Sequence, residues 1–444
     1  MKSIFRSSLL SHWTSRRTHP RSGLLENVAR CLNQYYSSDS RESLPRYQDD
    51  TNRRTDMSGE FRQYLGQRIK ATGAITVAEY MKECLTNPMY GYYTRKNPIG
   101  RQGDFITSPE VCQIFGELLT LWCINEWAIA GAPTAFQIIE LGPGSGILAS
   151  DILRIASSFA QVRNHFTLHL VERSPALAGV QAQRLGIVNV ERKSEDAVPY
   201  QHGVSQYGVP VSWYLRIQDI PKAPAFIVAN EFFDALPIHK FQKTENGFRE
   251  VMVDLNRENG QLMFALAPQS TPATRLIPSP CKHRDHLEFS LESAVILDDI
   301  ADRVADCGGG ALIIDYGHEG TKGDTFRGFR EHRVVDALDS PGGTDLTADV
   351  DFSILKALLK PKAVTFGPIL QYEFLANMAF ERRFDALMRA CRSDSERQRL
   401  ESACDVLINP AKMGGQFFAF AVVGKSRSSL GQLSGFTAIK TEGQ

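Results

Sequence analysis

The sequence predicts a doubly wound α/β fold, with a helical extension before the main domain and an antiparallel hairpin insertion within it. The prediction rests on three observations. Short apolar runs alternate with stretches of helical periodicity, a pattern typical of a parallel sheet covered by helices on both faces. A glycine-rich turn joins the first of these runs to a helix, as in many ligand-binding α/β domains. Two Asn-Gly dipeptides, the strongest short-range signal for hairpins, interrupt the alternation.

The composition fits a globular protein of one large domain or two ordinary ones. Of the 444 residues, 43% are hydrophobic and 23% are charged, which leaves enough apolar side chains for a sizeable core. The formal net charge is zero, so no nucleic-acid partner is expected. No apolar run reaches the length that spans a membrane. The eight cysteines include no CxxC pair, so we expect neither a structural metal site nor a disulfide framework.

Residues 1–38 have the composition of a mitochondrial transit peptide. They contain a single acidic residue, Glu26, and six basic ones: Lys2, Arg6, Arg16, Arg17, Arg21 and Arg30. Acid-poor N-termini rich in Arg and Ser are typical of such presequences, and a disordered basic tail or a short nucleic-acid-binding arm is the alternative. Residues 39–57 are polar and are interpreted as a linker. The expected location of the protein is therefore the mitochondrial matrix.

Residues 58–132 are expected to form the N-terminal helical extension. Ser108 and Pro109 suit the cap and the first turn of a helix, and apolar side chains follow them at helical spacing. The main domain is expected over residues 133–424. Residues 425–444 are rich in Ser, Gly and Thr and are interpreted as a flexible tail.

Short apolar runs are the expected strands of the main domain. They cover residues 136–141, 167–172, 225–230 and 311–316, with closing strands from 364 and over 416–423. The alternation stops near 239–295, where Asn246-Gly247 and Asn259-Gly260 are each flanked by strand-like runs. We therefore expect the antiparallel insertion in this section.

The motif with the clearest chemistry is Glu140-Leu-Gly142-Pro-Gly144-Ser-Gly146, which follows a strand and opens a helix. Glycines allow a sharp turn and a close approach of a ligand to the backbone. The amides at a helix N-terminus favour anionic or polar ligand groups. Glu172, at the end of the next strand, is placed to accept hydrogen bonds from both hydroxyls of a ribose. These residues predict a nucleotide-like cofactor.

Three interpretations of this motif are open at the level of the sequence. In the first, S-adenosylmethionine binds along all three glycines, and the carboxylate of Glu140 suits the ammonium group of the methionine moiety. In the second, residues 144–149 fit the GxGxxA pattern of an NAD or FAD site. In the third, the turn only packs the helix against the strand. We favour S-adenosylmethionine, because NAD has no cation that would need Glu140.

An acidic turn over residues 230–237 follows the strand expected at 225–230. Ligands of doubly wound sheets bind outside the carboxyl ends of the strands, so this turn is the expected place of a methyl acceptor. Glu231 and Asp234 are the candidate catalytic residues, and no metal is expected to take part. If the acceptor is an arginine, two carboxylates can orient its guanidinium group and draw charge from the attacking nitrogen. In the alternative, the neighbouring phenylalanines are core residues and Glu231 is a solvated loop acid.

The chain resembles the MidA family over residues 75–423. The matching stretches are 89–93, 103–110, 115–118, 140–146, 171–175, 230–237, 314–317, 327–330 and 345–351. The resemblance implies a class I, Rossmann-like methyltransferase fold with an N-terminal helical extension, and S-adenosyl-L-methionine as the cofactor. It also implies that Gly142, Gly144 and Gly146 form the cofactor loop and that Glu172 binds the ribose.

The mitochondrial members of this family are protein arginine methyltransferases that assist the assembly of respiratory complex I. The resemblance therefore implies symmetric dimethylation of an arginine in the 49-kDa-type iron–sulfur subunit of complex I, and it leaves a homodimer open. Ordinary protein arginine methyltransferases surround the guanidinium group with two glutamates, whereas this chain offers Glu231 and Asp234. Residues 327–330 and 345–351 gain no role from the sequence.

The sequence leaves functions other than arginine methylation open. A non-catalytic assembly factor would keep the cofactor pocket only for the stability of its fold. A methyltransferase could also act on a small molecule or on RNA, although the neutral charge disfavours RNA. An NAD oxidoreductase would bind a nicotinamide cofactor in place of S-adenosylhomocysteine.

Overall fold

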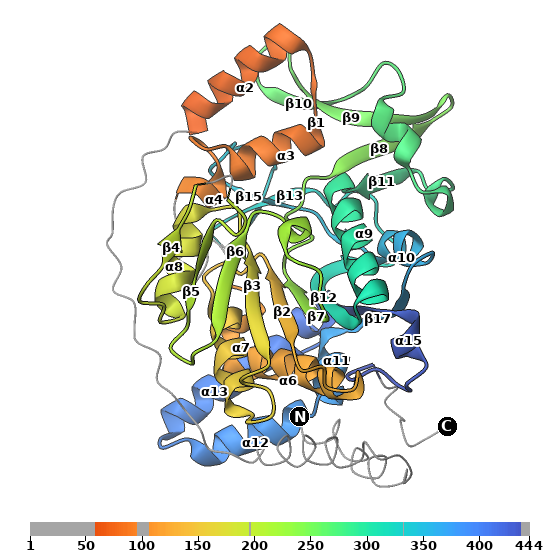
Figure 1. The fold of residues 1–444 in the computed structure, drawn as a ribbon. Coiled ribbons are helices and arrows are strands. Elements are labelled where there is room, and N and C mark those ends of the chain that lie inside the picture. Colours follow the sequence, from red (N-terminus) through yellow and green to blue (C-terminus); the bar gives the residue numbers. More distant parts are fainter. Residues whose placement is uncertain (1–57, 96–105, 195–196, 332, 437–444) are drawn as a thin grey trace.

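The computed structural model describes residues 58–95, 106–194, 197–331 and 333–436. The transit peptide expected at 1–38 and the linker expected at 39–57 lie outside the described residues. Figure 1 shows a central sheet with helices on both sides and a smaller sheet packed at one end of it.

The central sheet confirms the predicted doubly wound architecture. Its five middle strands run parallel, and an antiparallel strand follows them on each side. From one edge to the other, the strands are β17 (Val364–Leu370), β18 (Phe417–Val423), β12 (Gly309–His318), β7 (Ala225–Asn230), β2 (Phe136–Leu141), β3 (Phe166–Val171), β6 (Pro210–Tyr214), β5 (Gln201–Val204) and β4 (Glu191–Arg192).

The order of the strands switches direction at β2. The chain passes from β2 to β3 on one side, whereas β7, which comes later in the sequence, pairs with the other side of β2. A switch of this kind leaves a crevice at the carboxyl ends of the strands, where the ligands of α/β proteins bind. The glycine-rich turn follows β2 and the acidic turn follows β7, so the fold brings the two predicted motifs to the same edge.

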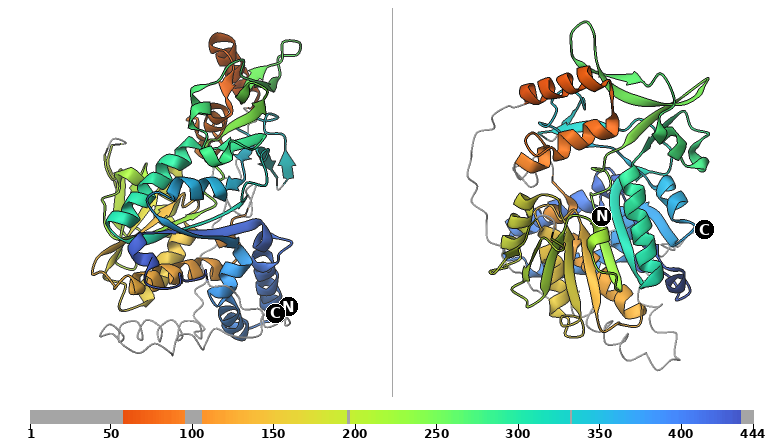
Figure 2. Two further views of the ribbon diagram at one scale, coloured as in Figure 1. Left: turned by 90° about the vertical axis from the view of Figure 1, so that its right-hand side faces the viewer. Right: turned by 45° about the horizontal axis from the view of Figure 1, so that its top comes forward.

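Helices cover both faces of the central sheet. Ile138 of β2 packs with one group of helices and Ile139 with the other, because alternate residues of a strand point to opposite faces. Figure 2 shows these helical layers from two further directions. The first group is α6 (Gln113–Ile129), α7 (Ile147–Ser158), α8 (Pro175–Arg184), α11 (Gln371–Asn377), α12 (Phe380–Ala390) and α13 (Asp394–Ile408), and the second is α9 (Leu291–Asp306) and α10 (Phe352–Leu359).

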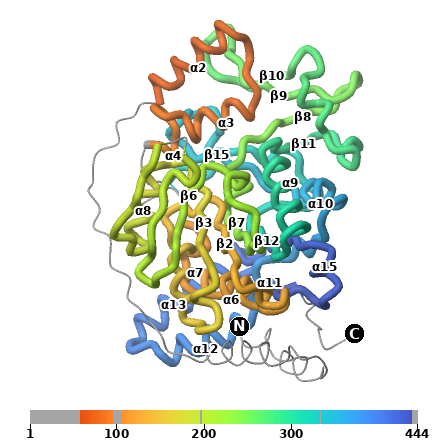
Figure 3. Tube along the Cα trace, viewed as in Figure 1, coloured from red at the N-terminus to blue at the C-terminus, as the bar shows by residue number. Residues whose placement is uncertain are grey.

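The smaller sheet contains the predicted hairpins. The strands β8 (His239–Thr244) and β9 (Gly247–Leu255) turn at Asn246-Gly247, and β10 (Leu262–Leu266) pairs with β9. The strand β11 (His286–Phe289) joins β8, and the short β1 (Ile75–Thr76) joins β9. Figure 3 shows α2 (Ser58–Thr72) and α3 (Val77–Thr86) beside these strands, although they lie far apart in the sequence.

The packing divides the chain differently from the expected boundary at residue 132. Of the described residues in the expected extension, the elements up to α4 (Tyr92–Arg95) pack with the smaller sheet, whereas α6 packs in the same core as β2. The reason is that α6 is apolar on nearly all sides, so it must be covered all round. Similarly, α9 begins at Leu291, inside the section expected to be the insertion, yet it packs against the central sheet.

The segment expected as a flexible tail, 425–444, is packed as far as it is described, to residue 436. The Arg427 guanidinium group donates two hydrogen bonds to the carboxylate of Glu126 on α6, with N···O distances of 2.6 and 3.1 Å. Both side chains are buried, and Leu433 is buried beside them. A buried carboxylate is costly without a partner, and this cost explains why a segment rich in Ser and Gly is held in place.

Candidate functional site

The glycine-rich turn connects β2 to α7 through three left-handed glycines. Gly142, Gly144 and Gly146 have φ angles of 64°, 53° and 79°, which residues with a Cβ rarely adopt. Gly146 is also the N-cap of α7, so the free amides of that helix face the switch point. A Cβ on Gly142 would lie 2.7 Å from a ring carbon of Phe232, in the acidic turn. The two predicted motifs are therefore in van der Waals contact.

We expect Gly142→Ala to lower the free energy of unfolding by about 1–3 kcal/mol and to weaken the binding of S-adenosylhomocysteine. The added methyl group meets the Phe232 ring, and the left-handed conformation adds backbone strain. Gly247→Ala is the matched control, because Gly247 has a φ of 87° but no atom within 4 Å of an added Cβ. Chemical denaturation and calorimetry measure both effects. Equal losses in the two variants would show that the contact with Phe232 does not matter.

Glu140 is a buried acid whose carboxylate lacks a full set of partners. Its side chain is 3% exposed, and Oε2 accepts no hydrogen bond within the described part of the chain. Burial, reinforced by the nearby charges of Asp151 and Glu172, raises the pKa of Glu140 to about 8. Such a group is stabilised by a cation beside it. The ammonium group of an amino-acid ligand would fit this position.

Glu172 directly follows β3, and neighbouring groups hold its carboxylate. Oε1 accepts a hydrogen bond from the Ser174 amide at 2.7 Å, and Oε2 accepts one from Gln181 Nε2 at 2.9 Å. Burial raises the pKa of Glu172 to about 7. Because an ionised carboxylate can accept about four hydrogen bonds, it can still accept one from a ribose hydroxyl. Together with Glu140 and the glycines, this geometry fits S-adenosyl-L-methionine.

A short helix, α5 (Ser108–Val111), adds two contacts that the sequence did not predict. The Ser108 amide donates a hydrogen bond to Oε1 of Glu231 at 2.8 Å. The Ser145 hydroxyl of the glycine-rich turn donates one to Oε1 of Glu110 at 3.2 Å. The helix α5 therefore links the cofactor turn to the acidic turn. The sequence indicated a helix start at Ser108-Pro109, but the cap is Thr107 and Ser108 is the first helical residue. The place of this helix beside both turns depends on the tertiary fold.

Of the two acids of the acidic turn, Asp234 is buried and Glu231 is half-buried. Glu231 adopts a left-handed φ of 51°, and its Oε1 accepts hydrogen bonds from the Ser108 amide and from Asn230 Nδ2. Burial, with the charge of Asp234 nearby, raises the pKa of Glu231 to about 8. Burial also raises the pKa of Asp234, to about 6. Glu231 is thus a bonded pocket acid, not the solvated loop acid of the alternative interpretation.

The acidic turn is organised by Asp315, a residue that the sequence did not single out. Its Oδ2 accepts hydrogen bonds from the amides of Phe232, Phe233 and Asp234 at 3.2, 3.0 and 3.3 Å. Burial and the charge of Asp234 hold the pKa of Asp315 well above its usual range. The sequence did contain an indication, because Asp315 comes near the end of an otherwise apolar run. Only the pairing of β12 with β7 shows that this acid faces the turn.

A cavity of about 760 Å³ opens beside the acidic turn. Glu231 and Tyr316 line it, together with residues of the two stretches without an assigned role, 327–330 and 345–351. The strands β13 (Arg327–Arg330) and β15 (Asp345–Thr347) come from those stretches, and they form a third small sheet with β14 (Arg333–Val335). The cavity is therefore the best candidate for the acceptor pocket.

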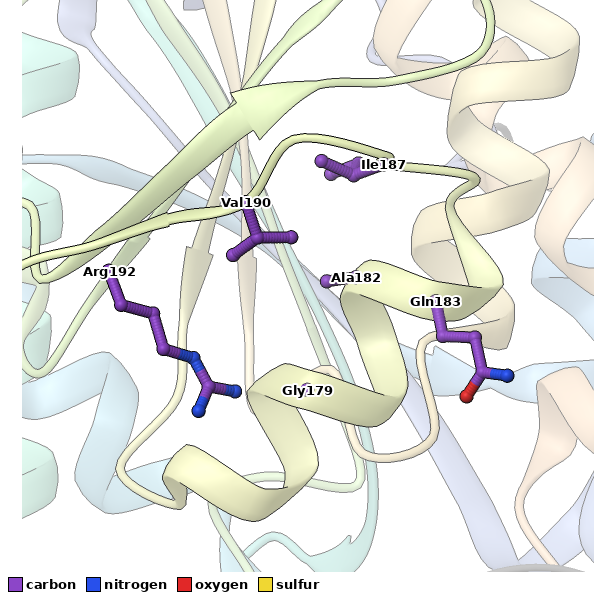
Figure 4. A pocket seen from close by; sticks show the side chains of 6 residues that line it. All are labelled: Gly179, Ala182, Gln183, Ile187, Val190 and Arg192. Atoms are coloured by element: carbon purple, nitrogen blue, oxygen red, sulfur yellow. The ribbon is translucent and has the colours of Figure 1, made fainter.

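A second hollow lies beside α8, and no residue of either turn lines it. Figure 4 shows its lining, which is mostly apolar and includes Gly179, Ile187, Val190 and Arg192. Its volume is about 390 Å³, and none of the predicted site residues lines it. Within the described ranges, no helix combines the length and apolarity needed to cross a membrane, and no cluster of His, Cys, Asp or Glu is arranged to hold a metal ion.

Known proteins resemble this chain over most of its length. A family described as S-adenosyl-L-methionine-dependent methyltransferase matches residues 118–369. The mitochondrial protein arginine methyltransferase NDUFAF7 of Danio rerio is 46% identical over 85% of this chain and 92% of its own. The Homo sapiens protein of that name is 48% identical over 82% of this chain and 83% of its own. The Drosophila melanogaster homologue is 40% identical over 81% of this chain and 84% of its own.

The fold has also been seen in a solved structure. A COG1565 superfamily protein from Burkholderia thailandensis, bound to S-adenosyl-homocysteine, superposes with a TM-score of 0.69. The match covers 86% of this chain and 95% of that one, at 24% sequence identity. At this identity the likeness supports the fold, and the ligand is a property of that protein.

Proposed function

Because this chain belongs to the family of S-adenosyl-L-methionine-dependent methyltransferases that includes mitochondrial protein arginine methyltransferases, we propose that it methylates an arginine of a protein in the mitochondrial matrix. S-adenosyl-L-methionine is the cofactor of the family. One observation supports arginine above other acceptors: the cavity lined by Glu231 has more carboxylates in its wall, Glu231, Glu319, Asp345 and Asp349, than basic side chains, Lys322 and Arg327.

The residues around the glycine-rich turn would hold the cofactor. Glu140 binds the ammonium group, Glu172 binds the ribose hydroxyls, and Gly142, Gly144 and Gly146 let the backbone approach the nucleoside. When bound, S-adenosyl-L-methionine supplies an electrophilic methyl group on its sulfonium. Family membership also disfavours the NAD and FAD interpretation of the same motif.

A guanidinium group is the natural complement of the acidic turn. It has five N–H donors and no acceptor, and it stays protonated at physiological pH. The turn offers the carboxylates of Glu231 and Asp234, and both Asp234 Oδ1 and Asn230 Oδ1 lack a hydrogen-bond donor among the described residues. In this proposal, the two carboxylates orient the guanidinium and aim one nitrogen at the methyl group. They also draw positive charge away from that nitrogen.

The finer proposal concerns the protein substrate. Likeness to the MidA family suggests an arginine of the 49-kDa-type iron–sulfur subunit of complex I, methylated symmetrically during assembly of the complex. Mass spectrometry of complex I subunits from cells with and without this protein tests it. Loss of a dimethylated arginine on that subunit supports the proposal. An unchanged modification together with failed assembly would favour a non-catalytic assembly factor.

The ionisation of the acidic turn predicts a pH dependence. Below about pH 8 the Glu231 carboxyl group is protonated, because burial raises its pKa to about 8, and a neutral acid cannot pair with a guanidinium group. We therefore expect kcat/KM for the protein substrate to rise between about pH 6 and pH 8, by at most about tenfold per pH unit. Glu231→Gln should remove the upper part of this rise. A flat profile, at saturating cofactor, would contradict the assignment.

A further inference from the structure

The guanidinium group of Arg327 is held between two rings at the wall of the acceptor pocket. It lies 5.2 Å from the centroid of the Tyr316 ring and 5.4 Å from that of Phe329. Its Nη2 is 2.7 Å from Oδ1 of Asp349, and its Nη1 donates a hydrogen bond to the Thr325 carbonyl at 2.8 Å. Cation–π contacts and an ion pair thus fix this side chain, which carries its charge into the cavity.

Tyr316 connects this arginine to the acidic turn. Its hydroxyl donates a hydrogen bond to Oδ2 of Asp234 at 2.5 Å, and its ring lies under the Arg327 guanidinium group. The other oxygen of the same carboxylate, Oδ1, accepts no hydrogen bond within the described part of the chain. One oxygen is therefore held by the tyrosine, and the other is a buried acceptor without a partner among the described residues.

We propose that Tyr316 and Arg327 are positioning residues that orient the Asp234 carboxylate toward the acceptor arginine. This inference rests on the proposed function. In this proposal, Tyr316 fixes the rotation of the carboxylate by holding Oδ2, and the buried Oδ1 is the oxygen left to accept a hydrogen bond from the guanidinium group of the substrate. Arg327 holds the tyrosine ring in place through its cation–π contact. Tyr316 lies on β12 and Arg327 on β13, and we expect that neither binds the cofactor.

The charges around Asp234 give this arrangement a measurable signature. The groups that face its carboxylate are Tyr316 and Asp315 from β12, Arg327 from β13, Tyr93 from α4 and Glu231 from its own turn. Of these, only Arg327 is positively charged. The hydrogen bond from Tyr316 and the charge of Arg327 both lower the pKa of Asp234, against the larger effect of burial. Removal of either should raise that pKa.

Four variants test the inference. Tyr316→Phe removes only the hydroxyl group, Arg327→Gln removes the charge, and Arg327→Lys keeps the charge without the planar stack. Arg330→Gln is the matched control, since Arg330 ends the same strand and is exposed. Each variant is assayed for transfer of a radiolabelled methyl group to the recombinant 49-kDa-type subunit over a range of pH. Binding of S-adenosylhomocysteine is measured by calorimetry in parallel.

We expect Tyr316→Phe and Arg327→Gln to lower kcat at least about tenfold with little change in KM, because a hydrogen bond to a charged group is lost or misaligned. The acidic limb of the pH profile should move to higher pH in both. Arg327→Lys should retain the wild-type limb in part, and Arg330→Gln should match the wild type.

Two results would overturn the inference, and they are distinguishable. If both variants keep the wild-type kcat and acidic limb while the wild type methylates the subunit, the positioning roles are wrong and the proposed function stands. If the wild type transfers no methyl group although it binds S-adenosylhomocysteine, the proposed function fails and the inference fails with it. A loss of S-adenosylhomocysteine binding in Tyr316→Phe would also contradict the inference, because it would place this residue in the cofactor site.

Discussion

Glu231→Gln or Asp234→Asn is expected to lower kcat for arginine methylation by about 10²- to 10³-fold. Each amide is close in shape to the acid that it replaces but carries no charge, and its NH₂ group faces a guanidinium group that has only donors. The attacking nitrogen is then no longer oriented. It also keeps more of the positive charge of the guanidinium group, which makes it less nucleophilic. Because the two acids act on one group, the double variant should lose much less than the product of the single losses.

The control for this prediction is the cofactor site, which should be intact. Both variants should bind S-adenosylhomocysteine within about twofold of the wild type, and Glu245→Gln, an exposed change in the β8–β9 hairpin, should have wild-type activity. Radiolabel transfer to the protein substrate measures kcat, and calorimetry measures binding. Undiminished methylation by either amide variant would remove that residue from the catalytic role.

The second large effect concerns the cofactor. Glu140→Gln is expected to weaken S-adenosylhomocysteine binding by about 10- to 150-fold, the equivalent of a hydrogen bond to a charged group. The effect should grow with pH. Glu140 is protonated below about pH 8, where it cannot pair with an ammonium group, so the wild type should bind more tightly as the pH rises toward that value. The variant should show no such rise.

A smaller ligand separates this effect from general damage to the pocket. Methylthioadenosine has the nucleoside of the cofactor but lacks the amino-acid end, so Glu140→Gln should leave its affinity unchanged. Glu172→Gln, at the predicted ribose position, should weaken both ligands. If Glu140→Gln weakened methylthioadenosine as much as S-adenosylhomocysteine, the ammonium assignment would be wrong.

The raised pKa of Glu140 also predicts how the stability of the ligand-free protein changes with pH. The folded pKa of Glu140, about 8, exceeds the value of about 4.3 expected in an unfolded chain. Between those values the folded state binds more protons than the unfolded state, so stability falls as the pH rises through this window. Glu172, whose pKa is raised to about 7, acts in the same direction.

The parts of the fold that the sequence predicts best are those set by local patterns. All six residues of β2 and all six of β7 are buried, so each strand is visible as an apolar run. The turn at Asn246-Gly247 is equally local. By contrast, β5 contains Gln201, His202 and Gly203, and β4 has two exposed charged residues, so neither gives a strand signal. These two segments are strands because they pair with each other and β5 pairs with β6.

The candidate site was predictable only in the residues that follow the central strands. Glu140, Glu172 and Glu231 each lie at the carboxyl end of a strand, where a parallel sheet places its ligands. Asp315 and Tyr316 stand at the end of another strand, but their roles depend on contacts with the acidic turn. Those contacts follow from strand pairing, which periodicity along one segment cannot show.

The stretches 327–330 and 345–351 were even harder to interpret from the sequence alone. Arg327 reaches the acceptor pocket from β13, which pairs with β15 in a separate small sheet. Nothing near Arg327 in the sequence indicates a pocket, because its partners, Tyr316 and Asp349, come from other elements. Sequence patterns of this kind predict where strands and turns occur, whereas the composition of a pocket also requires their arrangement in space.

A crystal structure of the protein with S-adenosylhomocysteine tests the central claim most directly. We predict that the nucleoside lies across the turn after β2, with the amino group of the ligand within about 3.2 Å of Glu140 Oε2 and the ribose hydroxyls bonded to Glu172. A ligand bound elsewhere, such as the hollow beside α8, or a Glu140 carboxylate that stays unpaired in the complex, would contradict it.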